Sequence, residues 1–189
     1  MAEFLKNGFQ AASLRNIVKT AGVTTGAFYG YYKSKEELFD ALVKTQYDVF
    51  MGMYKGTQES FAALDAKKQM ENMGVQSGEC LKKMMEYEYE HKDAFKLLLC
   101  CAEGTKYENM VHEMVETEVD ATHAFAENMQ KLGYPEYCVD PTLEHILVSG
   151  MFTAFFEMII HDVPFEKATA YLQELRDFYT AGWKRIMGF

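Results

Sequence analysis

Apolar residues recur every three or four positions along almost the whole chain, which is the spacing of one face of an α-helix. The alternating apolar and polar runs, punctuated by Asn-Gly or Asp-Gly, that mark β-hairpins are not found. The pattern predicts an all-α protein of about nine helices. They are expected near residues 1–7, 14–20, 24–32, 34–61, 65–91, 93–103, 108–132, 141–161 and 164–188.

The first third of the chain carries clear helix-start signals. Ser13 and Thr24 can each accept a hydrogen bond from a free amide in the first turn of the helix that follows. Ser34 and Glu37 have the spacing of a capping box, in which the serine accepts from the glutamate amide and the glutamate side chain returns a bond. These signals predict three short helices followed by a long one.

The second and third of these helices form a helix-turn-helix candidate, because the turn between them contains Gly22. Ile17, Val23 and Phe28 can form the small core that fixes the angle between the helices. The second helix begins with the small residues 24–27, which can enter a major groove about 12 Å wide. The spacing alone is equally compatible with an ordinary helical hairpin whose tyrosines lie in the core.

The charge distribution divides the chain in two. The net charge is −9, which taken whole argues against a nucleic-acid binder. Residues 1–47 carry six basic and four acidic residues, however, and the rest carries 13 basic and 24 acidic residues. A mildly basic domain at 1–47 and a strongly acidic one at 48–189 suit a molecule that presents one end to a polyanion.

The segment GFQAASLRNIVKTAGVTTGAFYGYYKSKEELFDAL closely resembles the DNA-binding domain of the tetracycline-repressor (TetR) family of bacterial transcriptional regulators. The resemblance covers residues 3 to 47 and includes Gly8-Phe9, Ala21-Gly22-Val23, Phe28-Tyr29 and the run from Ser34 to Leu38. It implies an N-terminal three-helix DNA-binding domain and a C-terminal helical domain for ligand binding and dimerisation. The function implied is a ligand-responsive regulator, a repressor, that binds palindromic operator DNA as a homodimer.

Carried over position by position, the resemblance assigns DNA contacts to nine residues. These are Ser13, Arg15, Thr24, Thr25, Gly26, Ala27, Tyr29, Tyr31 and Lys35. Ser13 and Arg15 begin the first helix of the motif, residues 24–27 face the groove, and Tyr29, Tyr31 and Lys35 occupy phosphate-contact positions. Lys33 is expected to be a solvated charge first and a phosphate contact second.

Two features depart from the family pattern. The first helix is shortened to MAEFLKN, closed by Gly8, and so short a helix has little stability of its own. Gly26 and Gly30 both fall in the third helix, at a cost of roughly 1 kcal/mol each relative to alanine. The alternative function is therefore a small-molecule-binding or protein-interaction protein whose DNA binding is impaired.

The acidic domain is rich in methionine and aromatic residues, which suits an adaptable pocket for an apolar or aromatic effector. The expected lining is Met84, Tyr87, Phe95, Tyr107, Met110, Met114, Phe125 and Phe152. For any single residue, a place in a Met-rich core is the more common outcome.

The helices expected at 141–161 and 164–188 are joined by a two-residue loop and must pack antiparallel. Their apolar content exceeds what one helical hairpin can cover, which suits a homodimer interface. The residues expected there are Ile146, Gly150, Phe155, Leu175, Phe178 and Trp183.

A metal-dependent helical enzyme is a further alternative, since Glu88-x-x-His91 has the spacing used in di-metal bundles. Such a site needs a second Glu-x-x-His and two more inward carboxylates, and Glu88 lies in the polar run EYEYEHKD, so a solvated face is expected. We predict no enzyme activity, no metal and no cofactor.

Three sequence features favour a cytoplasmic protein that is not bound to a membrane. Four cysteines without a CxxC pair indicate free thiols in a reducing compartment. No apolar run of membrane-spanning length and no signal peptide are seen.

Overall fold

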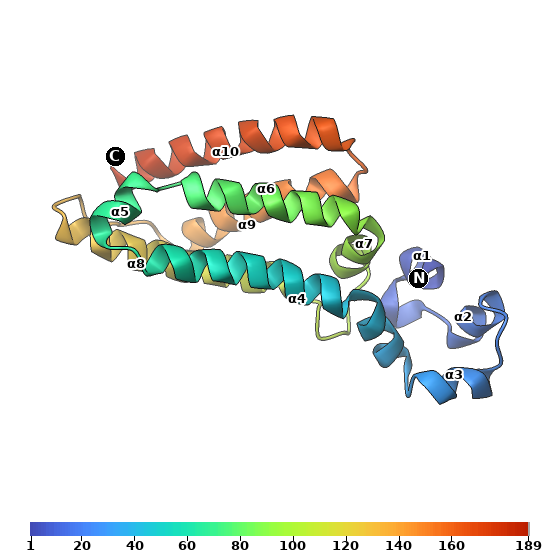
Figure 1. Ribbon diagram of the computed structural model, residues 1–189. Helices are drawn as coiled ribbons and strands as arrows, with labels where there is room; N and C mark the ends of the chain where they lie inside the picture. The colour runs from blue at the N-terminus through green and yellow to red at the C-terminus, as the bar shows by residue number, and fades with distance from the viewer. Residues whose placement is uncertain (189) are drawn as a thin grey trace. The chain divides into compact units, whose positions relative to one another are not determined.

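A computed structural model describes residues 1–188, which form ten helices and no strand (Figure 1). The helices are α1 (Ala2–Ala11), α2 (Leu14–Thr20), α3 (Thr25–Tyr31), α4 (Lys35–Ala62), α5 (Ala66–Glu71), α6 (Val75–Glu90), α7 (Lys92–Cys100), α8 (Met110–Lys131), α9 (Pro141–Ile160) and α10 (Phe165–Met187). The all-α prediction is confirmed. The described part of the chain has ten helices where nine were expected, because the helix expected at 65–91 is divided into α5 and α6.

The helix expected at 65–91 is interrupted between α5 and α6. Asn72 follows the end of α5, and Gly74 has a φ of 75°, in the left-handed region that favours glycine. Asp65 caps the start of α5, because its Oδ1 accepts a hydrogen bond from the Lys68 amide at 3.0 Å. The interruption brings Gly74 to the start of α6, where it contributes to the cavity described below.

The chain divides into two compact units, Met1–Val49 with Glu90–Met110 and Phe50–Tyr89 with Val111–Phe189. The division near residue 49 lies close to the expected boundary at 47. However, the first unit also takes in Glu90–Met110, which the sequence analysis assigned to the second domain. One hydrogen bond that ties this segment to α1 runs from the Phe9 amide to the Cys101 carbonyl, at 2.9 Å.

An aromatic cluster forms the core of the first unit. The Phe4 and Phe9 rings of α1 each meet the Phe39 ring of α4 edge-on, with centroids 5.2 and 5.3 Å apart. Gly8, at φ 71° and ψ 171°, interrupts α1 between the two phenylalanines. The short first helix is therefore stabilised by burial of its aromatic side chains and not by its own propensity.

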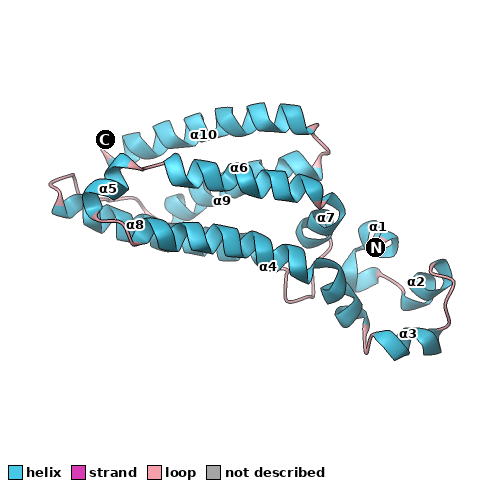
Figure 2. Ribbon diagram, in the orientation of Figure 1, coloured by secondary structure: helices cyan, strands magenta, loops and turns pink. Residues whose placement is uncertain are grey.

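The second unit is a bundle in which α6, α8, α9 and α10 run lengthwise beside one another (Figure 2). Its core includes Tyr54, whose ring meets the Phe152 ring edge-on at 5.7 Å, and Phe50, whose ring lies 5.8 Å from that of Phe156. Among the described residues, α9 is long and apolar enough to cross a membrane, but by length and composition only, a test that core helices of soluble proteins also pass.

Glu88 contradicts the expectation of a solvated face on α6. It is 1% exposed, and its Oε1 has no hydrogen-bond partner among the described residues. Burial raises the pKa of this carboxyl well above its ordinary value of 4.5 and so favours the neutral acid in the folded protein.

Replacing Glu88 should remove a pH dependence of stability. Between pH 4.5 and the raised pKa, the unfolded chain releases a proton that the folded protein retains, so the free energy of unfolding falls as pH rises through this range. Urea unfolding of Glu88→Gln should show this fall reduced, whereas the exposed control Glu86→Gln should behave as the parent. Identical pH profiles for the parent and Glu88→Gln would contradict the assignment.

Candidate nucleic-acid interface and internal cavity

The turn between α2 and α3 is fixed by side-chain caps at both helix starts. Ser13 Oγ accepts from the Asn16 amide at 3.4 Å, and Thr24 Oγ1 accepts from the Ala27 amide at 3.1 Å. Gly22 takes a φ of 68°, and the amide of Val23 bonds the Val18 carbonyl at 3.0 Å. The predicted caps are confirmed, and Ser13 and Thr24 thus have structural roles whatever else they contact.

The core between these two helices differs in detail from the expected one. Phe28 is buried as expected, but Val23 is 46% exposed and Val18 is buried at 5%. Val18 is the buried residue of α2 and Phe28 that of α3, whereas Val23 lies in the turn between the two helices. Tyr32 packs beside Phe28 with ring centroids 5.7 Å apart, as expected for a residue of this core.

The side chains assigned to DNA lie mostly on an exposed surface of the first unit. Arg15 on α2 is exposed, as are residues 24–27 at the start of α3. Tyr29 is 55% exposed and Tyr31 84% exposed, which is unusual for rings that have a nearby core available. A surface of small residues flanked by a guanidinium and two phenol hydroxyls matches the chemistry of groove and phosphate contacts.

Glu3 is part of this site and was not predicted. Its Oε1 accepts from the Ser13 amide at 3.1 Å and from Asn16 Nδ2 at 3.2 Å. The hydrogen bond from the Ser13 amide is the main cause that lowers the pKa of this carboxyl, and the Asn16 bond adds to it. Glu3 thus attaches α1 to the start of α2, a contact over ten residues for which the sequence carries no local signal.

Lys35 is already engaged inside the first unit. Its Nζ donates to the carbonyls of Gln10 and Ala12, at 3.0 and 3.1 Å, and lies 4.6 Å from the centre of the Phe9 ring. A cation at the end of α1 interacts favourably with the partial negative charge of the free carbonyls there. An ammonium has three N–H donors, so phosphate contact by Lys35 stays a prediction for the third.

The capping box of α4 is also modified. The Glu37 amide donates to Ser34 Oγ at 3.2 Å, as expected. The return bond, however, runs from the amide of Lys33 to Glu37 Oε2, one residue earlier than predicted.

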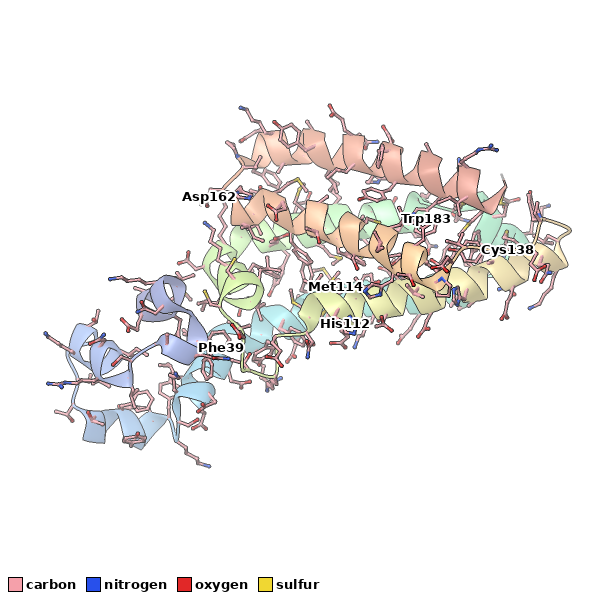
Figure 3. The ribbon with its side chains drawn as sticks, turned by 180° about the vertical axis from the view of Figure 1, so that it is seen from behind. Phe39, His112, Met114, Cys138, Asp162 and Trp183 are labelled. Carbon is pink, nitrogen blue, oxygen red and sulfur yellow. The ribbon has the colours of Figure 1, made fainter. Side chains whose placement is uncertain are left out.

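The second unit contains a cavity of about 170 Å³ between α4, α6, α8, α9 and α10. Its wall includes the rings of Phe61, Phe125, Phe152, Tyr179 and Trp183. Figure 3 shows Trp183 on α10.

Three of the eight predicted pocket residues, Met84, Phe125 and Phe152, line this cavity. The other five do not. Phe95, Tyr107 and Met110 are buried in the first unit, Met114 is 0% exposed, and Tyr87 is half-buried. Helical spacing shows that a side chain points inward, but it cannot tell a packed core from the wall of a cavity.

A carboxyl group and a guanidinium line the cavity. Glu118 Oε2 lies 3.0 Å from the Tyr54 hydroxyl and accepts from Gln58 Nε2 at 2.6 Å. Burial raises the pKa of Glu118. Arg176 Nη2 donates to the Gly74 carbonyl at 3.3 Å. None of these polar residues was predicted for the pocket.

A shallow groove of about 580 Å³ lies between α9 and α10 and is lined by Met158, Tyr171, Leu175 and Phe178, among others. Phe178 is 72% exposed and Ile146, also expected at the interface, is 59% exposed.

Three other residues assigned to the interface have roles inside the unit. Phe155 is 3% exposed, because α9 turns this residue toward the bundle core, and Trp183 lines the cavity, so neither lies on an open surface. A Cβ added to Gly150 would lie 3.3 Å from the Tyr179 hydroxyl, so this glycine permits close packing of α9 and α10.

Potential metal ligands are scattered. Within residues 1–188, no group of three or more His, Cys, Asp or Glu side chains could hold a metal ion. His123 Nε2 lies 2.7 Å from the buried carboxylate of Glu144, which also accepts from the Tyr137 hydroxyl at 2.9 Å. His123, an exposed residue of α8, is thus hydrogen-bonded to a buried carboxyl and not to a metal-binding cluster.

Two capped short helices around a glycine turn, with the start of the second helix exposed, define a helix-turn-helix protein of the DNA-binding class. Residues 1–42 match the sequence model of the family described as bacterial regulatory proteins, tetR family. These N-terminal residues are thus similar to the DNA-binding domain of the tetR family, as the resemblance implied. A crystal structure of a transcriptional regulator (TerR/AcrR family) from Aquifex aeolicus VF5 is 25% identical, with 97% of this chain and 92% of that chain covered and a TM-score of 0.43.

Substituting Lys35 should destabilise the protein as well as weaken DNA binding. Lys35→Met keeps much of the apolar stem but removes both bonds to the end of α1, so the free energy of unfolding should fall by about 1–2 kcal/mol. Lys33→Met, at an exposed neighbouring position, is the matched control and should leave unfolding by urea unchanged. Equal stability of the two variants would show that the capping contacts of Lys35 contribute nothing.

Proposed function

We propose that this protein is a ligand-responsive repressor that binds a palindromic operator duplex as a homodimer in the cytoplasm, where such DNA is found. The observation that carries the proposal is the exposed start of α3, with Thr25 and Ala27 on its surface and Tyr29 and Tyr31 projecting beside it. Small side chains let the helix approach base edges, and the hydroxyls and Arg15 supply phosphate contacts.

The alternative, a protein with impaired DNA binding, depended on an unstable first helix. In the structure Phe4 is 0% exposed and Glu3 bonds the start of α2. These contacts give α1 a packed core and a link to the motif, which favours the regulator.

The exposed apolar residues of α9 and α10 support a homodimer. Ile146 and Phe178 are large, apolar and more than half exposed, and Tyr171 beside the groove is 46% exposed. A second copy of the same surface would cover them in a two-fold arrangement. Such a dimer would present two recognition helices to half-sites about one helical turn, ~34 Å, apart.

The cavity supports regulation by a small molecule. Tyr54, Gln58 and Phe61 of α4 line it, while residues 35–49 of the same helix belong to the unit that contains α3. A ligand that binds one arrangement of the cavity helices more tightly shifts the population toward that arrangement, by no more than its difference in affinity. We infer that α4 carries this shift to the DNA-binding unit.

DNA recognition can be tested with duplexes selected from a random-sequence library by the full protein. We expect a two-fold symmetric site and an affinity that falls steeply with salt. Arg15→Ala should weaken binding to selected and unrelated duplexes alike and reduce the salt slope by about one, whereas Thr25→Val should change the selected sequence. Lys67→Ala, an exposed cation of the second unit, is the control. Parental affinity of Arg15→Ala and Tyr31→Ala at every salt concentration would refute the contact assignment.

The dimer can be tested by sedimentation. Phe178→Asp and Ile146→Asp place a charge at the centre of the proposed interface, so both variants should sediment as monomers at concentrations where the parent is a dimer. Val75→Asp introduces the same charge at another exposed apolar residue, 49% exposed, and should remain dimeric. If the parent is itself a monomer, or both Phe178→Asp and Ile146→Asp stay dimeric, the proposed interface is wrong.

A further inference from the structure

The cavity has the size and lining of a site for a single ring. An apolar cavity of about 150 Å³ can hold benzene, and this one measures about 170 Å³ with aromatic side chains from α4, α8, α9 and α10 in its wall. Its lining includes one carboxyl group, that of Glu118, and one guanidinium, that of Arg176. Their environments decide which charge a ligand must complement.

Arg176 presents a guanidinium that is only partly satisfied. It makes one hydrogen bond, to the Gly74 carbonyl, and within the described part of the chain no carboxylate lies at ion-pair distance from it. A guanidinium stays protonated and has five N–H donors arranged to bind a carboxylate with two parallel bonds. The cavity thus contains a positive charge whose remaining N–H donors can bind a ligand.

Gly78 makes room for this guanidinium. A Cβ added at residue 78 would lie 1.8 Å from Arg176 Nη2 and 2.1 Å from Cζ, so the guanidinium lies directly against the α6 backbone. Any side chain at residue 78 would displace it. The position of Arg176 in the cavity therefore depends on a glycine in the middle of a helix, where glycine is otherwise unfavourable.

Glu118 does not cancel this charge. Its Oε2 contacts the Tyr54 hydroxyl, which also lies 2.9 Å from the Met114 carbonyl. A tyrosine has one hydroxyl proton, so both contacts are satisfied when the second proton comes from a neutral Glu118 carboxyl. Burial raises the pKa of Glu118 and outweighs the hydrogen bonds with Tyr54 and Gln58, which lower it, so the net shift is toward the neutral form.

We propose that the effector is a small monocarboxylic acid with one aromatic ring, whose carboxylate pairs with Arg176 while its ring occupies the apolar part of the cavity. This rests on the proposed function only in calling the ligand an effector. An amine would require Glu118 to ionise in a buried site and would face the guanidinium, so cationic ligands are disfavoured. A neutral ring would leave the Arg176 donors unpaired.

The single tryptophan of the chain, Trp183, lines this cavity and reports its occupancy directly. We would titrate the full protein with phenylacetate, benzyl alcohol and benzylamine and follow tryptophan fluorescence. Phenylacetate should give a saturable change, with a dissociation constant lower than those of the alcohol and the amine by about tenfold or more, as expected for a charge-assisted pair. Equal or tighter binding of the alcohol or the amine would overturn the proposal, as would the absence of phenylacetate binding.

Two variants test the role of the guanidinium. Arg176→Met removes it, and Gly78→Ala displaces it while favouring the helix, so each should weaken phenylacetate binding about tenfold. Arg185→Met, at an exposed residue of α10 outside the cavity, and Gly182→Ala, at a helical glycine with open space around it, are the matched controls. Parental affinity of both Arg176→Met and Gly78→Ala would overturn the proposal.

Duplex selection by the ligand-free protein separates failure of this proposal from failure of the proposed function. If the protein selects a symmetric duplex but does not bind phenylacetate, the proposed regulator function is retained and the proposed carboxylate-binding site is refuted. If the protein binds phenylacetate through Arg176 but selects no duplex, the carboxylate-binding site is supported and the proposed DNA-binding function is refuted.

Discussion

Helix α4 has to supply buried side chains to two separate cores, and the rest of the structure depends on this constraint. Phe39 and Val43 are 0% exposed in the first unit, and Phe50 and Tyr54 are buried in the second. Their spacing of four, seven and four residues keeps one apolar face along about four turns of helix. Both the aromatic cluster of the first unit and part of the cavity wall are therefore built on residues of one element.

Helix boundaries could be predicted where a side chain bonds the adjacent backbone. Ser13, Thr24 and Ser34 act over three residues, so their capping bonds are visible in the sequence and are found in the structure. The break at Gly74 was missed because a glycine inside an apolar helical pattern is tolerated as often as it ends a helix. The allocation of Glu90–Met110 to the first unit depends on contacts such as that between Phe9 and Cys101, which no local pattern encodes.

The two parts of the candidate site differ in how far the sequence reveals them. Most of the surface proposed to contact DNA lies on residues 24–31, which are close together in the sequence, so the small residues at 24–27 and the exposed tyrosines mark it directly. The cavity is assembled from five helices, and its polar groups matter through distances that sequence spacing does not contain. The contact of Arg176 with Gly78 joins residues nearly a hundred positions apart, and it assigns the guanidinium to the cavity.

The Arg176 guanidinium and the Glu118 carboxyl in the cavity lower the stability of the second unit. This loss of stability argues that the two groups have a function. A guanidinium with one hydrogen bond, and a carboxyl whose pKa is raised by burial, are both unfavourable inside a bundle that needs only packing. Glu144, by contrast, is equally buried but accepts hydrogen bonds from Tyr137 and His123, and so serves the core. Buried polar groups without hydrogen-bond partners are commonly found at functional sites, where a ligand can supply the missing partners. In the proposal made here, the cavity is such a site because most of the Arg176 donors are unpaired.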